Sequence, residues 1–121
     1  MYAHSGAVFL ADDEDDLRDT LQDWFEEEGF LVLPAREGAE ALARMSGFTG
    51  SAVVIVDLVM PGMDGWRLID AMRARPDLAR IPVIVLSAYG SPPAGVARVF
   101  RKPYDPDALL DSVRELIQRG C

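Results

Sequence analysis

The stretch AVVIVDLVMPGMDGW, residues 52–66, decides the fold of this chain. Its first five residues are apolar and rich in Val and Ile, and a run this short and β-branched predicts a buried strand. Asp57 follows directly, so an acid stands at the carboxyl end of that strand. Asp64 can cap a helix that begins close behind it. The stretch therefore predicts a strand, an acidic strand end and a helix in succession.

The same alternation extends over the rest of the chain. Further apolar runs predict strands at residues 7–11, 30–33, 82–86 and, more weakly, 97–100. Apolar residues at three- and four-residue spacing predict helices between them. The first helix carries Leu17, Leu21, Trp24 and Phe25 and stops at Gly29, and the second covers residues 38–45. The third begins at Asp64, carries Trp66, Ile69 and Met72, and ends at Pro76. The last begins near Pro106 and carries Leu109, Val113, Leu116 and Ile117. Because apolar strands joined by helices form parallel sheets covered on both faces, we expect one doubly wound α/β domain with five strands over residues 1–121.

The composition of the whole chain excludes several function classes. Its 121 residues suffice for one domain, and its net charge of -8 argues against direct binding to nucleic acid or to an anionic membrane. Cys121 is the single cysteine, so an internal disulfide cannot form. No apolar run could span a membrane, and the first residues lack a signal-peptide pattern. We expect a cytoplasmic protein that binds a cation or a basic protein surface.

Polar side chains follow four of the five predicted strands. Asp12 and Asp13 follow the first strand, Asp57 the third, Ser87 the fourth and Lys102 the fifth. The carboxyl ends of parallel strands share one edge of a sheet, which is where α/β domains place their sites. Acids packed together there repel one another unless a cation is bound. Mg²⁺ is the cation of choice, because it takes one or two carboxylates and shares ligands with phosphate, and the chain has no His/Cys cluster for zinc or copper.

A magnesium site beside an aspartate points to phosphoryl transfer. Carboxylates form aspartyl phosphates as covalent intermediates, so Asp57 can act as the nucleophile. Lys102 and Ser87 would then bind the phosphoryl oxygens. Phosphoryl transfer depends mainly on positioning and charge neutralisation, which a metal, an ammonium and a hydroxyl supply together.

Four motifs, FLADDEDDLR, VVIVDLVMPGMDGW, PVIVLSA and FRKPYD, resemble in this order the receiver domain of two-component response regulators. The resemblance covers nearly the whole chain and implies a flavodoxin-like sheet of order 2-1-3-4-5. It implies that Asp57 accepts a phosphoryl group from a histidine kinase or phosphotransfer protein. It also implies that Asp12, Asp13 and Asp57, with the backbone carbonyl of Val59, bind Mg²⁺.

The resemblance assigns the other site residues as well. Lys102 would contact the phosphoryl group, and the Lys102–Pro103 bond would be cis. Ser87 would be the hydroxyl that moves onto the phosphoryl oxygen. The MPGMDG segment would form the turn after the phosphorylated strand. A protein of this kind catalyses only its own phosphorylation and dephosphorylation, so we do not expect an enzyme with a separate substrate.

Simpler interpretations of these residues exist. Asp12 and Asp13 could cap the first helix, and Lys102 could be a solvated surface charge. We expect Glu14, Asp15 and Asp16 to belong to the first turn of that helix, where its dipole favours them. A dehalogenase-like phosphatase would carry a D-x-D pattern, whereas this chain has a valine two residues after Asp57. A receiver-like docking module that never uses phosphorylation is the main alternative. The chain is compatible with a complete single-domain regulator or with part of a longer protein.

The segment between the fourth and fifth strands departs from the family pattern. Gly90, Pro92, Pro93 and Gly95 leave room for about one helical turn where the family has its fourth helix. We therefore expect that helix to be shortened or missing. The apolar strand before it should then have an uncovered face, so we expect a second copy or another partner on the flank of strands four and five.

Two further departures concern switching and signal lifetime. Val99 stands at the family's aromatic switch position, and Phe100 should face the opposite side of the sheet, so neither it nor Tyr104 is a clear substitute. Val59 and Tyr89 stand where polar residues can assist hydrolysis in the family. We therefore predict a relatively long-lived aspartyl phosphate.

Overall fold

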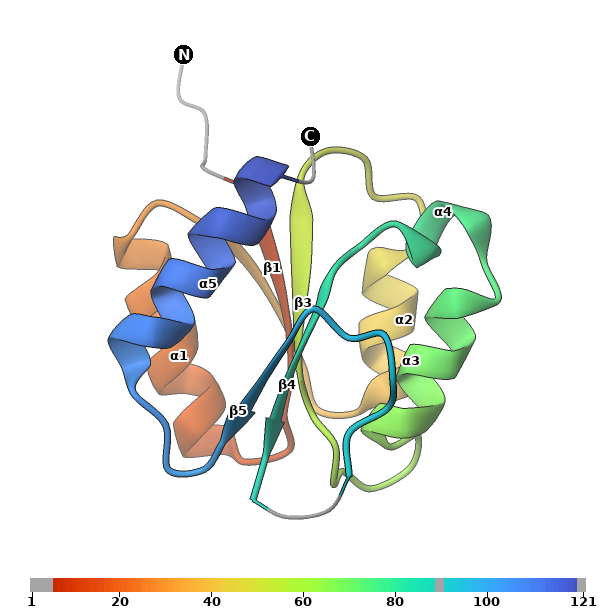
Figure 1. Ribbon diagram of the computed structural model, residues 1–121, viewed down its shortest axis with the longest axis horizontal. Coiled ribbons are helices and arrows are strands. Elements are labelled where there is room, and N and C mark those ends of the chain that lie inside the picture. Colours follow the sequence, from red (N-terminus) through yellow and green to blue (C-terminus); the bar gives the residue numbers. More distant parts are fainter. Residues whose placement is uncertain (1–5, 89–90, 120–121) are drawn as a thin grey trace.

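The computed structural model describes residues 6–88 and 91–119. These residues contain a five-stranded parallel sheet with helices packed around it (Figure 1). The strands lie in the order β2-β1-β3-β4-β5, which confirms the expected topology. Each strand lies within two residues of its predicted position at either end. Their bounds are β1 Ala7–Ala11, β2 Leu31–Ala35, β3 Ala52–Asp57, β4 Val83–Ser87 and β5 Arg98–Arg101.

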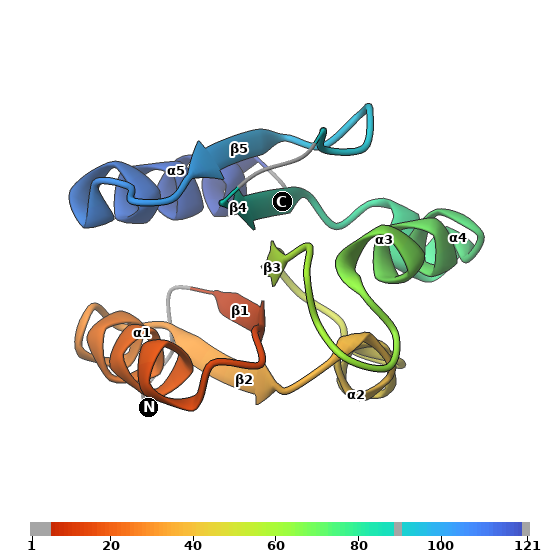
Figure 2. The same cartoon turned by 90° about the horizontal axis from the view of Figure 1, so that it is seen from below.

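Helices cover both faces of the sheet, as predicted. Helices α1 and α5 lie on one face, and α2 and α3 lie on the other, as the view from below shows (Figure 2). At the end of α1, Gly29 has a φ of 97°, which confirms the predicted stop. The helices are α1 Asp15–Glu27, α2 Gly38–Met45, α3 Gly65–Arg73, α4 Pro76–Ala79 and α5 Pro106–Arg119.

The third helix ends just before Pro76, as predicted. Helix α3 ends at Arg73 with Ala74 as its C-cap, and Pro76 begins the further single turn α4. Proline suits the first position of a helix because its missing N–H would lack a helical partner there.

The alternation of side chains along the central strands divides the core into two layers. Phe9 of β1 and Val54 of β3 face α2 and α3, whereas Leu10 and Ile55 face α1 and α5. All residues of β1, β3 and β4 are buried. This two-sided burial is the reason that these strands consist of continuous apolar runs.

Two helical residues differ from the predicted pattern. Trp66 belongs to the apolar spacing that predicted helix α3, but it is 37% exposed and donates from Nε1 to the carbonyl of Ser91 outside the core. Arg18 is buried in α1, where its guanidinium donates to the backbone carbonyl of Asp12 at 2.8 Å and to Asp15 at 2.5 Å. A buried guanidinium needs such partners, and here they join the start of α1 to the end of β1.

The segment between β4 and β5 contains no helix among its described residues, Ala88 and 91–97, which confirms that prediction. The expected uncovered face of the fourth strand is wrong, because β4 is fully buried. The segment 91–97 lies back against α3: Trp66 and Arg73 donate to the carbonyls of Ser91 and Ala94, and Val96 packs on the α2–α3 side of the core. The burial of β4 removes the reason to expect a second subunit on this flank, although Val99 of β5 is 39% exposed.

Candidate functional site

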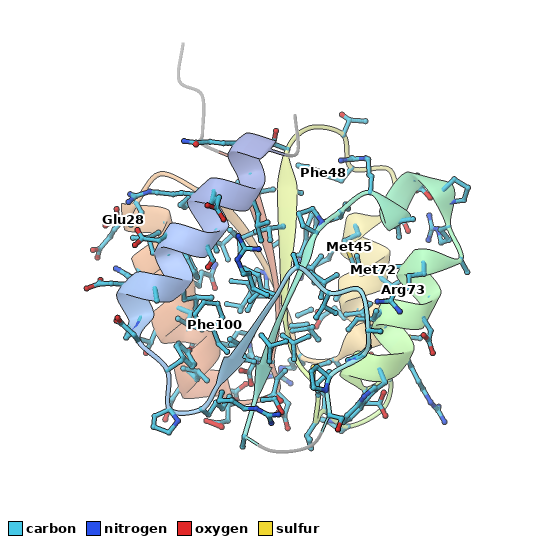
Figure 3. The ribbon with its side chains drawn as sticks, in the orientation of Figure 1. Glu28, Met45, Phe48, Met72, Arg73 and Phe100 are labelled. Carbon is cyan, nitrogen blue, oxygen red and sulfur yellow. The ribbon has the colours of Figure 1, made fainter. Side chains whose placement is uncertain are left out.

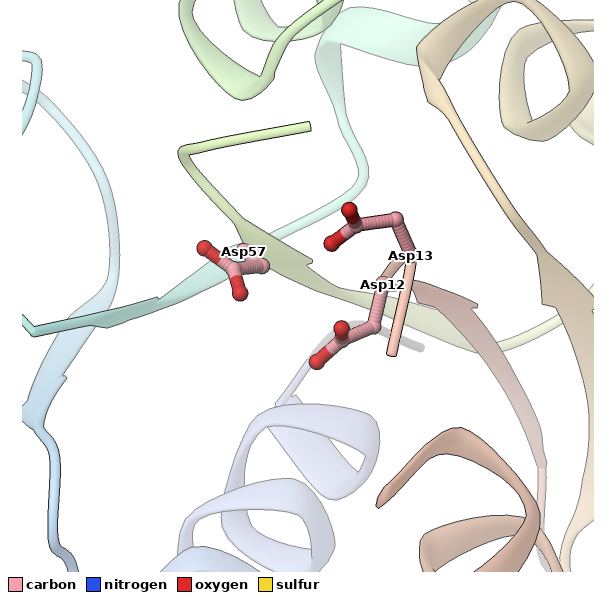
Figure 4. Close-up of side chains that lie close together, drawn as sticks. All are labelled: Asp12, Asp13 and Asp57. Carbon is pink, nitrogen blue, oxygen red and sulfur yellow. The ribbon is translucent and has the colours of Figure 1, made fainter. Parts of the chain in front are cut away.

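Three carboxylates meet at the carboxyl edge of the sheet (Figure 4). Asp57 ends β3, and Asp12 and Asp13 follow β1, which is the strand beside it. One oxygen from each carboxylate lies within 4.8 Å of the others. Asp12 and Asp57 are buried, whereas Asp13 is exposed. The parallel register of neighbouring strands thus brings together the acids that the sequence predicted.

Asp12 is held in an unfavourable environment for a charge. Its Oδ1 accepts from the backbone N–H of Glu14 at 2.8 Å, while its buried Oδ2 has no hydrogen-bond partner. Burial raises the pKa of Asp12 from 3.8 to about 6; the bond from Glu14 works against this rise, and the charge of Asp57 adds to it. The orphaned oxygen is therefore available to a cation.

Asp57 is engaged from two sides. Lys102 Nζ donates to its Oδ2 at 2.8 Å, and the backbone N–H of Val59 donates to its Oδ1 at 3.0 Å. Burial tends to lower the pKa of Lys102, but its hydrogen bond to Asp57 and the nearby acidic charges outweigh this effect and raise the pKa. Lys102 thus carries a positive charge at neutral pH, directly against the carboxylate. The Lys102–Pro103 bond is cis, as expected.

These residues border an open hollow of about 320 Å³. The donor set fits a hard divalent cation, because it offers three carboxylates from two adjacent strands and one of their oxygens has no other partner. Val59 is 54% exposed at the rim of this hollow. The hollow is lined by Asp13, Glu14, Asp57, Val59, Ala88 and Lys102.

Ser87 occupies the end of β4, as predicted. It is buried, its carbonyl accepts from the backbone N–H of Lys102 at 2.9 Å, and Ala88 after it lines the hollow. Tyr89 lies outside the described residues, so only Val59 of the pair that we linked to phosphate lifetime is described by the structure, and the predicted lifetime stays a prediction. Phe100 packs on the α1–α5 side of the core while Val99 is exposed, in agreement with their expected opposite directions (Figure 3).

Sequence reasoning missed the residues that hold the loop after β3. Glu37 accepts with Oε1 from the backbone N–H groups of Ala39 at 2.8 Å and Met63 at 3.2 Å, and so ties this loop to the start of α2. A Cβ on Gly65 would lie 2.7 Å from Leu58 Cα, so only glycine fits there. Neither contact has a local pattern, because each depends on how distant segments pack. Asp64 caps α3 as predicted, with Oδ1 accepting from the N–H of Arg67 at 3.0 Å.

An apolar groove of about 460 Å³ adjoins the hollow on the side of α1. Leu17 and Trp24 form one wall, and Pro103 and Tyr104 form the other. Burial raises the pKa of Tyr104. Leu17 and Trp24 belong to the predicted apolar stripe of the first helix, but they are only half-buried because they border this groove.

The sequence model of the response regulator receiver domain matches residues 8–114, which include every site residue named above. The chain belongs to this family. Receiver domains of this family act in two-component signalling, and phosphorylation on aspartate and use of Mg²⁺ are general among them.

Curated relatives share the receiver domain with this chain. The C4-dicarboxylate transport transcriptional regulatory protein DctD of Rhizobium meliloti is 38% identical over 117 residues, which are 89% of this chain and 24% of DctD. The sensory transduction protein RegX3 of Mycolicibacterium smegmatis is 31% identical over 122 residues, covering 95% of this chain and 52% of RegX3. The chain thus spans about half or less of the length of these two relatives.

Solved structures show the same arrangement. The receiver domain of the Francisella response regulator 1452 aligns with a TM-score of 0.84 at 30% identity and covers 95% of this chain and 98% of that one. A CheY-like receiver domain protein from Methanospirillum hungatei aligns with a TM-score of 0.83 at 28% identity, with 97% and 98% covered. Among the described residues, none of the helices has the length and apolar character needed to cross a membrane.

Proposed function

We propose that Asp57 is the phospho-acceptor of this receiver domain, and that residues 1–121 work as one such domain. The observation that carries this proposal is the position of its carboxylate at the sheet edge, where Lys102 Nζ lies 2.8 Å away and two further acids share its hollow. A carboxylate oxygen of Asp57 forms the new P–O bond while the P–N bond of a phosphohistidine breaks. The electron pair of that bond stays on the donor's imidazole nitrogen.

We also propose that Asp12, Asp13 and Asp57 hold Mg²⁺ together with the backbone carbonyl of Val59. The buried Oδ2 of Asp12, which has no hydrogen-bond partner, supports this assignment. When bound, Mg²⁺ supplies positive charge to the acids and to the phosphoryl oxygens.

Lys102 and Ser87 complete the proposed chemistry. Lys102 is charged and already contacts Asp57, so it can follow the phosphoryl oxygens as negative charge moves onto them. Ser87 ends the strand beside β3, one position beyond the residue that pairs with Asp57, and its hydroxyl is the proposed donor to a phosphoryl oxygen. These steps modify only the protein itself, which accordingly has no separate substrate.

The proposed partner is a histidine kinase or a phosphotransfer protein. A donor that places its phosphohistidine at Asp57 must also cover the surface next to the hollow. The apolar groove between Trp24 and Tyr104 lies there, and we propose that the donor docks into it. These partners imply a cytoplasmic location.

Intact mass after incubation with Mg²⁺ and acetyl phosphate tests the proposal. We expect an adduct of one phosphoryl group on the parent, none on Asp57→Asn, and none when EDTA removes the metal. Asp70→Asn, at an exposed position on α3, is the matched control and should be labelled like the parent. A folded parent that forms no adduct would favour the phosphorylation-independent docking module. An adduct that persists in Asp57→Asn would place the phosphoryl group on another residue and overturn the assignment of Asp57.

A further inference from the structure

A second pocket lies away from the acidic hollow, between the end of α3 and the segment that precedes β5. Its volume is about 230 Å³, and it reaches Val83, the first residue of β4, whereas Asp57 is the last residue of β3. Figure 3 shows Met72 and Arg73 at the α3 side of this region. The pocket is lined by Ile69, Met72, Arg73, Leu78, Ala79, Arg80, Ile81, Pro82, Val83, Gly95 and Ala97.

Two arginines border this otherwise apolar pocket. Arg73 donates to the carbonyl of Ala94, and Arg80 donates to the carbonyls of Gly50 at 3.3 Å and Phe48 at 3.5 Å. Neither forms a salt bridge with a carboxylate of the described residues. Backbone carbonyls satisfy N–H groups but do not neutralise a positive charge, so both guanidiniums can attract a further anion.

The charge of the surrounding chain strengthens this attraction. Residues 71–104 contain Asp77 as their only acid but carry six cations, although the protein has a net charge of -8. Residues 12–28 show the opposite bias, with ten acids and one arginine. The lining of the pocket contains two arginines and no acid, although the protein as a whole is acidic. Of the other cations in residues 71–104, Arg75 forms a salt bridge with Asp77, Arg98 with Glu115 and Lys102 with Asp57.

We propose that this pocket docks an acidic segment of a partner protein, which inserts one apolar side chain between carboxylates that pair with Arg73 and Arg80. The floor is formed by buried apolar side chains of α3, α4 and β4, and so favours an apolar group. A volume of about 230 Å³ falls below the usual range for drug-sized ligands and suits a single side chain. The proposal is independent of phosphorylation at Asp57.

Selection from a random 12-residue peptide display library tests the proposal. Peptides selected on the parent protein should be enriched in Asp or Glu next to Leu or Phe. Fluorescence polarisation with the selected peptides should show binding that weakens with salt. The double variant Arg73→Glu/Arg80→Glu should weaken it by at least about tenfold, and Ala79→Trp, which places a bulky ring at an exposed position of the pocket, should do the same without changing charge.

Arg36→Glu is the matched control, because Arg36 is an exposed arginine that follows β2, the opposite edge strand. It should bind the selected peptides like the parent, and circular dichroism should show that all variants are folded. Selection without acidic enrichment, or equal effects of the control and the double variant, would overturn the proposal. Self-association in sedimentation that Arg73→Glu/Arg80→Glu abolishes would identify a second copy as the occupant and overturn a separate partner.

Discussion

Replacing Asp12 by asparagine should make this receiver domain more stable relative to the parent as the pH rises from 4 to 7, when no metal is present. Asp12 is fully buried with one unpartnered oxygen, and its pKa is raised from 3.8 to about 6, chiefly by burial. Between these values the folded protein binds more protons than the unfolded chain, so stability falls as pH rises through this window. About two pH units at about 1.4 kcal/mol each give a cost of about 3 kcal/mol at pH 7.

Asparagine cannot ionise, so the Asp12→Asn variant escapes this cost. Its carbonyl oxygen can keep the hydrogen bond from Glu14, but its buried amide group lacks a hydrogen-bond acceptor. Such an unpaired donor lowers the free energy of unfolding by about 1–3 kcal/mol at any pH. This cost is the same at every pH, so it cancels when the stability of the variant is compared at two pH values. The stability of the variant relative to the parent should therefore rise by about 2–3 kcal/mol between pH 4 and pH 7.

Urea unfolding followed by circular dichroism measures this difference. In EDTA, the difference in free energy of unfolding between variant and parent should change with pH as stated. In Mg²⁺, the parent should gain stability by binding the ion, and the variant should gain less. Asp13→Asn is the control, because it removes the same charge from an exposed neighbour of Asp12. A gap that stays constant between pH 4 and pH 7 would refute the reasoning.

Three further predictions concern the loop, the groove and the phosphate lifetime. Val59→Asn should lose phosphate several-fold faster in intact-mass time courses, because a polar side chain at this exposed rim can hold a water near Asp57; an unchanged decay contradicts this. Trp24→Ala should slow phosphorylation by a protein donor about tenfold but not by acetyl phosphate, and equal slowing of both would argue against docking in the groove. Gly65→Ala should cost about 1–3 kcal/mol in urea unfolding, since its Cβ would meet Leu58 Cα at 2.7 Å, and an unchanged midpoint would show that the loop relaxes.

The sequence by itself determined the elements and the edge at which the site lies. Apolar runs that are buried on both faces have a local signature, so β1, β3 and β4 were predictable, whereas the partly exposed β5 gave only a weak signal. Parallel strands end at a common edge, and the polar residues after them, Asp12, Asp57 and Lys102, could therefore be placed together before any distance was known. The structure brings them together, with Lys102 Nζ 2.8 Å from Asp57. The two prolines and two glycines before β5 likewise predicted a shortened or missing helix, because their backbone effects are local, and the described residues Ala88 and 91–97 contain none.

Tertiary structure alone decided what covers each surface and which polar groups find partners. The sequence suggested an open face on β4, yet segment 91–97 folds back onto α3 and closes it. Trp66 lies outside the core because its Nε1 donates to the carbonyl of Ser91, and Arg18 is buried because its guanidinium donates to the carbonyl of Asp12. Tertiary contacts also determine that one oxygen of Asp12 has no hydrogen-bond partner and that two arginines border the pocket. Hydrogen bonding and burial depend on contacts between distant residues, and no periodic pattern along the chain records them.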